Sequence, residues 1–307
     1  MKASLLPASE TARGYAAAVS AYLMWGLIAP VYFKAVGAAG PAEIMAHRVL
    51  WTVVVMGVLV SVVRSRADVR AVIDSPRKLW VFLLTTTLVT ANWSIFVWAI
   101  SQSRLVEASL GYFINPLVNV ALGVVFLHEK LTRGQALAVA VAGIGVGAQV
   151  VEAGVFPWLP LTLALSFGFY ALVRKKEGVD PLTGLLVETA LLIPLALGYL
   201  LWLGDAGQFL GRQGDGVTGW LLILAGPMTA APLALFMYAG RRLTLSTLGL
   251  LQYIGPTGQL ILGVLAFGEA FTAADAAAFA CVWLALAIYT ADAWARRRAN
   301  AAARAVV

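Results

Sequence analysis

The chain has 307 residues, of which 61% are hydrophobic and 12% are charged, and its formal net charge is +7. Soluble domains carry about 25% charged residues, so the composition excludes an ordinary water-soluble fold. Cys281 is the only cysteine, which excludes an internal disulfide and a cysteine-rich metal site. The apolar residues come in runs of about 20, the length that crosses the hydrocarbon core of a bilayer as a helix.

These runs predict an all-α integral membrane protein with ten transmembrane helices. In chain order they cover 14–36, 42–63, 79–101, 107–127, 133–151, 157–173, 182–203, 219–240, 246–267 and 273–294. The runs are apolar on all faces, which excludes the alternating strands of an outer-membrane barrel. Residues 1–13 form a polar tail and 295–307 a basic tail. The first run is too long for a signal peptide and is expected to remain as helix 1.

Lysine and arginine follow a pattern that predicts the topology. Eighteen of the 22 fall on the tails and alternate connections: Lys2, Arg13, Arg64, Arg66, Arg70, Arg77, Lys78, Lys130, Arg133, Arg174, Lys175, Lys176, Arg241, Arg242, Arg296, Arg297, Arg298 and Arg304. The opposite connections hold only Arg104 and Arg212, while Lys34 and Arg48 lie within helices. The positive-inside rule therefore places both termini in the cytoplasm. The basic excess is a topology signal and does not indicate nucleic-acid binding.

The sequence repeats itself at an offset of about 140 residues, which predicts two five-helix repeats at 14–151 and 152–294. The identities under that shift pair Pro116, Leu122, Gly123, Val124, Glu129 and Thr132 with Pro256, Leu262, Gly263, Val264, Glu269 and Thr272. An odd number of helices turns the second copy upside down relative to the first. Inverted repeats recur in transporters, with the solute site near the midplane. Duplication also builds membrane scaffolds that transport nothing, so that alternative stays open.

Several segments resemble the RarD-type branch of the EamA family in the drug/metabolite transporter superfamily. They are Ser20-Ala21-Tyr22-Leu23-Met24-Trp25-Gly26, the 43–51 stretch with His47-Arg48, Gly111-Tyr112-Phe113-Ile114-Asn115-Pro116-Leu117 and Leu127-His128-Glu129. The resemblance implies a ten-helix fold in the bacterial inner membrane, with a central cavity that opens alternately to each side. It also implies export of small metabolites or drugs.

Two ionisable residues, His47 and Arg48, lie inside the second predicted helix and are candidates for the solute site. Ionisable groups at such depth are costly and mark functional sites. An arginine there can bind a carboxylate or phosphate with two parallel hydrogen bonds, and a histidine can exchange protons near neutral pH. The alternative is structural: Arg48 pairs with Glu43 and anchors the helix.

Matching polar faces on the fourth and ninth predicted helices are the best candidates for a pathway wall. Tyr112, Asn115 and Asn119 flank Pro116, and Gln252 and Gln259 flank Pro256. Each proline removes a backbone donor and frees carbonyls that a cavity or a neighbouring helix must satisfy. The alternative is hydrogen bonding between helices. Trp25, Tyr32, Asn92 and Trp93 complete the candidate set as a lining for flat solutes, with ordinary packing as the alternative.

Three other carboxylates have different expected roles. Glu129 and Glu269 follow apolar runs and are expected to anchor helix ends. Glu188 is expected to extend toward the cytoplasm, with a proton site as the alternative.

The Gly143 and Gly147 spacing predicts close helix packing.

No motif for enzymatic chemistry is present in the sequence. A phosphate-binding loop, a His-Glu-x-x-His pair and a Gly-x-Ser-x-Gly elbow are all missing. Two histidines predicted on opposite sides of the membrane cannot bind one metal. We therefore expect no enzyme, cofactor or metal. The partners we expect are membrane lipid, a small solute and a coupling proton or counter-solute. The sequence predicts a secondary exporter that works by alternating access. One alternative is a receptor or accessory subunit. The other is a membrane enzyme that modifies lipids, but the sequence lacks the cluster of acidic and histidine residues that such an enzyme needs.

Overall fold

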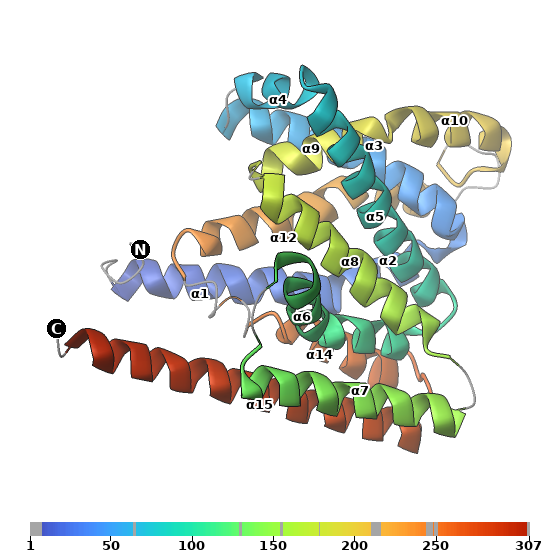
Figure 1. Ribbon diagram of the computed structural model, residues 1–307. Helices are drawn as coiled ribbons and strands as arrows, with labels where there is room; N and C mark the ends of the chain where they lie inside the picture. Colours follow the sequence, from blue (N-terminus) through green and yellow to red (C-terminus); the bar gives the residue numbers. More distant parts are fainter. Residues whose placement is uncertain are drawn as a thin grey trace. The chain divides into compact units, whose positions relative to one another are not determined.

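A computed structural model of the protein describes residues 8–63, 66–128, 131–153, 156–177, 179–209, 216–243, 248 and 251–305 (Figure 1). Within these ranges every regular element is a helix. The contacts divide the chain into two units, which are described separately. Unit 1 is Met1–Val106 with Val173–Glu269, and unit 2 is Glu107–Leu172 with Ala270–Val307. Each unit therefore takes segments from both predicted repeats.

Unit 1 holds most of the helices. They are α1 (Ala8–Leu23), η2 (Met24–Ile28), α2 (Ala29–Ala35), η3 (Gly37–Ala39), α3 (Gly40–Val63), α4 (Arg66–Ile73), α5 (Pro76–Ser101), α9 (Pro181–Leu191), α10 (Ile193–Leu203), η4 (Gly204–Ala206), α11 (Gly216–Ile223), α12 (Ala225–Gly240), α14 (Ile254–Ile261) and η5 (Leu262–Ala266). Unit 2 holds α7 (Arg133–Ala153), α15 (Ala273–Ala305) and most of α6 (Leu105–Leu127) and α8 (Trp158–Glu177).

Six helical stretches among the described residues are long and apolar enough to cross a membrane. They are Ser9–Ala35, Gly37–Val62, Pro76–Ser101, Leu105–Phe126, Gly216–Gly240 and Ala273–Asp292. A seventh is added when α9 and α10 count as one broken span. The remaining three predicted spans coincide with shorter apolar helices at Arg133–Ala148, Trp158–Arg174 and Ile254–Ala266. The all-helical membrane class is confirmed, and the count of ten stays a prediction.

Several details differ from the sequence prediction; among them, α15 continues to Ala305 where an end at 294 was expected. The helix predicted at 182–203 is bent by 44° between α9 and α10, where Pro194 in the first turn of α10 lacks a backbone donor. The connection predicted at 64–78 contains a further helix, α4. In the predicted 246–267 helix, α14 starts only at Ile254, while residues 244–247, 249 and 250 lie outside the described residues.

The core of unit 1 is formed by α3, α5, α9 and α12, which pack on one another. Met56 and Val60 of α3 cluster with Leu182 and Leu185 of α9. Another close contact joins η2 to α14: a Cβ added at Gly26 would lie 2.6 Å from the carbonyl oxygen of Gly255. Only glycine fits at position 26, because the facing atom is rigid backbone.

In unit 2, α7 and α15 run antiparallel side by side (Figure 1). Gly134 lies against Asp292, and Gly145 lies against Cys281, which fixes the antiparallel direction. Gly143 and Gly147, where close packing was expected, are exposed and have open space at the Cβ position. The close contact falls at Gly145 because that glycine points to the other face of α7.

Both α7 and α15 begin with the same hydrogen-bond pattern. The Thr132 hydroxyl accepts from the Gln135 amide at 3.2 Å, and the Gln135 side chain accepts from the Thr132 amide at 3.0 Å. Thr272 and Asp275 repeat this capping box, with distances of 3.1 and 2.9 Å. Such boxes satisfy free amides at a helix N-terminus. The two threonines are partners in the 140-residue sequence repeat, so repeat-related residues have the same local role.

Candidate functional site

Arg48 is the centre of a buried polar and aromatic cluster in unit 1. Its side chain is buried on α3, and its Nε donates to the Thr229 hydroxyl of α12 at 3.0 Å. That hydroxyl in turn donates to the Ala225 carbonyl at 2.9 Å. The guanidinium carbon lies 4.0 Å from the centre of the Trp93 ring on α5 and 5.6 Å from that of Phe33 on α2. Aromatic faces attract a cation, most strongly where water is excluded.

Two more of the predicted residues lie in this part of unit 1. The buried Tyr32 packs its ring 5.1 Å from Phe33 and donates its hydroxyl to the Leu221 carbonyl at 2.9 Å. Asn92, next to Trp93 on α5, is also buried. The structure therefore brings Arg48 and Trp93 into contact, and Phe33 connects Tyr32 to them. We name Arg48, Trp93, Phe33 and Thr229 the arginine box.

Glu43 has partners other than Arg48, against the structural alternative in which these two residues pair. Glu43 Oε1 accepts from the backbone amides of Gln208 at 2.7 Å and Phe209 at 3.3 Å, so this carboxylate holds the segment after η4. Sequence reasoning missed these partners because they lie some 165 residues away and use backbone donors.

His47 is buried beside Glu43. Its Nε2 is 4.0 Å from Glu43 Oε1, and its ring is 4.7 Å from the ring of Phe209. Neither ring nitrogen has a hydrogen-bond partner within the described residues. A buried polar atom without a partner is costly, so these nitrogens are candidates for contact with a solute or water.

Trp25 and Gln259 meet through the backbone of η2. In this π-helical segment the Ala29 amide donates to the Met24 carbonyl, five residues back. The corresponding donor for the Trp25 carbonyl would be Pro30, which has no N–H. Gln259 Nε2 donates to that carbonyl instead, at 3.3 Å. Gln259 Oε1 is buried with no hydrogen-bond partner in the described part of the chain.

The other predicted residues of the polar faces are divided between the units. Gln252 lies partly buried in a turn before α14 in unit 1. Tyr112, Asn115 and Asn119 are on α6 in unit 2: Tyr112 is partly buried, Asn115 is buried and Asn119 is exposed. Asn115 Oδ1 has no hydrogen-bond partner among the described residues. That the two faces line one pathway stays a prediction.

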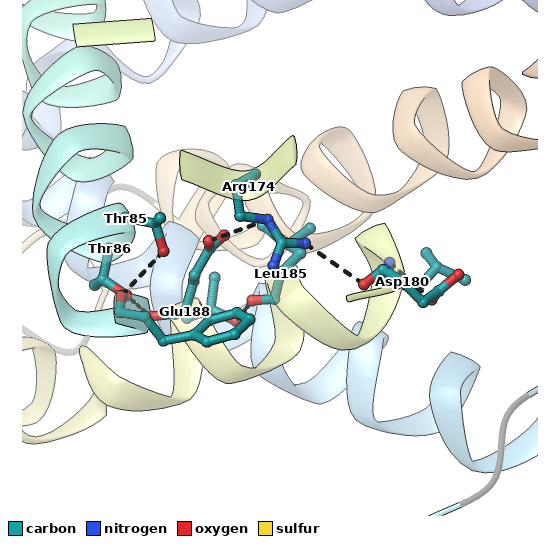
Figure 2. Close-up of polar contacts among 9 residues, drawn as sticks. Thr85, Thr86, Arg174, Asp180, Leu185 and Glu188 are labelled. Atoms are coloured by element: carbon teal, nitrogen blue, oxygen red, sulfur yellow. Dashed lines mark hydrogen bonds and ion pairs between the residues drawn. The ribbon is translucent and has the colours of Figure 1, made fainter. Parts of the chain in front are cut away.

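A buried ion pair was missed by sequence reasoning (Figure 2). Arg174 Nε lies 3.6 Å from Glu188 Oε1, with side-chain exposures of 11% and 1%. Glu188 therefore does not extend toward solvent as expected. Arg174 was assigned to a cytoplasmic connection because it precedes Lys175 and Lys176. The available signal was Glu188 itself, since a carboxylate within an apolar run requires a cation or a proton.

Glu269 confirms its expected anchoring role. Its two carboxylate oxygens accept from the amides of Leu105 at 2.9 Å and Val106 at 2.8 Å, at the first turn of α6. A carboxylate stabilises this end of a helix through the free amides and the helix dipole. Its repeat partner Glu129 lies outside the described residues. Within the described residues, no group of three or more His, Cys, Asp or Glu side chains is arranged to hold a metal ion.

Comparison with known proteins assigns the family. The EamA-like transporter family model matches residues 12–148. An uncharacterized transporter of Vibrio cholerae is 48% identical, over 92% of this chain and 93% of that protein. Protein RarD of Escherichia coli is 43% identical, over 96% of this chain and 100% of that protein. The chain belongs to the EamA-like transporter family.

This membership confirms the resemblance of the sequence segments to the RarD-type branch, and it makes the chain a multi-pass membrane protein of a transporter family. A crystal structure with 21% sequence identity has the same fold as this EamA-family chain. Its TM-score is 0.57, and the match covers 92% of this chain and 97% of the other.

Proposed function

We propose that this EamA-family protein is a secondary transporter that exports small metabolites or drugs across the bacterial inner membrane by alternating access. It moves its solute without catalysing a reaction. In this proposal ten spans form two inverted five-helix repeats, and both termini are cytoplasmic. The alternating basic connections, the matching capping boxes at Thr132 and Thr272, and the antiparallel packing of α7 on α15 support it.

The arginine box is the observation that carries the proposal. Burying a cation in an apolar span is costly, and such residues are retained where they serve a solute or ion pathway. Arg48 Nε donates to Thr229, and the rings of Trp93 and Phe33 lie 4.0 and 5.6 Å from the guanidinium carbon. An oriented guanidinium beside aromatic rings suits a flat solute that carries a carboxylate or phosphate group.

The proposed pathway consists of the polar and aromatic residues that the sequence analysis selected. Its members are Trp25, Tyr32, His47, Arg48, Asn92, Trp93, Tyr112, Asn115, Asn119, Gln252 and Gln259. The buried oxygens of Asn115 and Gln259 and the nitrogens of His47 support this assignment, because a solute or water would satisfy them. A proton or a counter-solute drives transport.

A receptor or accessory subunit is the second candidate function. The hydrogen bond from Gln259 to the Trp25 carbonyl favours it, because that bond uses a predicted pathway residue to join two helices. A solute that binds the purified protein and is carried across a vesicle membrane favours the transporter. A solute that binds but is not carried favours the receptor or accessory subunit.

A thermal-shift screen of the purified protein tests the binding part of the proposal. The panel contains amino acids, nucleosides and aromatic drugs. A ligand present at 100 times its dissociation constant stabilises the folded protein by about 2.7 kcal/mol. We expect a flat, anionic member of the panel to raise the melting temperature of the wild type and not of Arg48→Lys, which keeps the charge and loses the planar fork. A ligand that stabilises both proteins equally would contradict the arginine box as its site.

A further inference from the structure

The Arg174–Glu188 pair joins the last turns of α8 to the middle of α9. Besides its 3.6 Å contact with Glu188, Arg174 donates from Nη2 to the Asp180 carbonyl at 3.5 Å (Figure 2). Its guanidinium carbon lies 5.0 Å from the centre of the Phe82 ring on α5. Gly184 leaves the space that the guanidinium occupies, since a Cβ there would overlap it. One side chain thus connects three helices.

The two members of the pair differ in what they can exchange. A guanidinium stays protonated at every accessible pH, whereas a carboxylate accepts a proton and becomes neutral. Protonation removes the attraction that holds the pair together and leaves a carboxylic acid that needs no cation. Glu188 is therefore the member of the pair that can bind a proton reversibly. Arg174 keeps its positive charge and competes with that proton for the carboxylate.

Of the other described charged side chains near α9, Glu177 at the end of α8 is partly exposed, and the rest have positions or partners of their own. On α3, Glu43 and His47 lie beside Phe209, and Arg48 is in the arginine box. On α5, Arg77 is exposed and Lys78 donates to the Ala71 carbonyl. Arg70 on α4 and Asp74 after it are exposed, and α10 has no charged residue. Asp180 caps α9 by accepting from the amides of Leu182 and Thr183. Among the side chains that the structure describes, Arg174 is thus a charged partner of the Glu188 carboxylate.

Helix α5 links this pair to the arginine box. The Thr86 hydroxyl donates to the Glu188 backbone carbonyl at 3.5 Å, and Trp93 contacts Arg48. These two α5 residues are seven positions apart, which is two helical turns or roughly 10 Å. Helix α5 therefore contacts both Glu188 on α9 and the arginine box, where we place the solute.

We propose that Glu188 is the proton-binding site that couples transport, with Arg174 as its internal counter-ion. One proton binds a carboxylate oxygen of Glu188, the carboxylate becomes a neutral acid, and the guanidinium is released from Glu188. Deprotonation restores the pair and the connection between α8 and α9. This inference rests on the proposed transport function and assigns its coupling ion as a proton.

Infrared difference spectroscopy of the purified protein, with no solute added, tests proton binding. Acidification of the wild type should produce the carbonyl band of a protonated buried carboxyl group. Glu188→Gln should lose that band, and Glu188→Asp should keep it. Glu43→Gln is the matched control, because Glu43 is a second almost fully buried carboxylate among the described residues; it should keep the band that Glu188→Gln loses. A spectrum of Glu188→Gln that matches that of the wild type, or loss of the same band in Glu43→Gln instead, overturns the proposal.

Hydrogen exchange of the α9 amides tests the release of the connection. After correction for the chemical effect of pH, exchange in wild-type α9 should rise on acidification. In Glu188→Gln, which mimics the protonated state, exchange should be fast at every pH, and Glu43→Gln should follow the wild type. A pH dependence that persists in Glu188→Gln would contradict the mechanism. Because neither measurement uses a solute, failure here leaves the proposed transport function standing.

Discussion

At the scale of single residues, charged side chains in apolar helices are the positions where sequence is most informative. Arg48 could be selected because it interrupts an apolar run, and the structure gives it buried partners. The partners themselves could not be predicted, since Thr229 lies 181 residues away and carries no signal of its own. Arg174 was assigned to a connection because its neighbours Lys175 and Lys176 are also basic, but it lies within α8.

The Arg174–Glu188 pair predicts a pattern of stabilities at neutral pH. Arg174→Gln leaves a buried carboxylate without its cation, and breaking a buried pair costs about 3 kcal/mol or more. Adding Glu188→Gln removes that carboxylate, so the double variant should be more stable than Arg174→Gln alone. Unfolding of the detergent-solubilised protein measures both. A double variant that loses the sum of the two single effects would show that the residues act independently.

At the scale of elements, proline illustrates what sequence cannot decide. Pro116 and Pro232 lie inside the continuous helices α6 and α12, whereas Pro194 accompanies the bend between α9 and α10. The residue type is the same in all three cases, and the packing around the freed carbonyl determines the outcome. Some helix ends were predictable within a few residues because changes in apolar composition mark them, as at α3, which begins at Gly40 where 42 was expected.

The contact between α7 and α15 predicts different effects at two glycines on one helix. Gly145→Val should destabilise the protein, because a Cβ at this position would overlap Cys281, and overpacking of this kind costs about 1–3 kcal/mol. Gly143→Val is the matched control and should be nearly neutral, because its Cβ position is open. Thermal denaturation measures the difference. Equal losses in the two variants would mean that α7 packs through another face.

At the scale of the whole molecule, the class of an all-helical membrane protein could be predicted, because the length and composition of the apolar runs are strong signals. The family match and the apolar helices confirm that class. The division into two interleaved units was not predictable, because it depends on contacts between segments far apart in the sequence.

The proposed topology predicts which exposed residues can be labelled from outside. On a Cys281→Ala background, Ala38→Cys and Asp205→Cys should react with a membrane-impermeant maleimide in intact cells. Asp74→Cys should react only after the cells are opened, since its connection carries the basic residues. All three positions are exposed in the structure, so differences report the side of the membrane. Labelling of residue 74 alone in intact cells would contradict the proposed topology and would place its connection outside the cell.

Transport into proteoliposomes tests the central claim most directly. The purified protein is reconstituted and incubated with the panel of amino acids, nucleosides and aromatic drugs, and the vesicle contents are measured by mass spectrometry. We predict that at least one flat, anionic compound accumulates with the wild type, and that Arg48→Lys folds normally yet lowers this accumulation at least about tenfold, because lysine lacks the planar fork. Equal accumulation with the wild type and Arg48→Lys, or with the wild type and empty vesicles, would contradict the account.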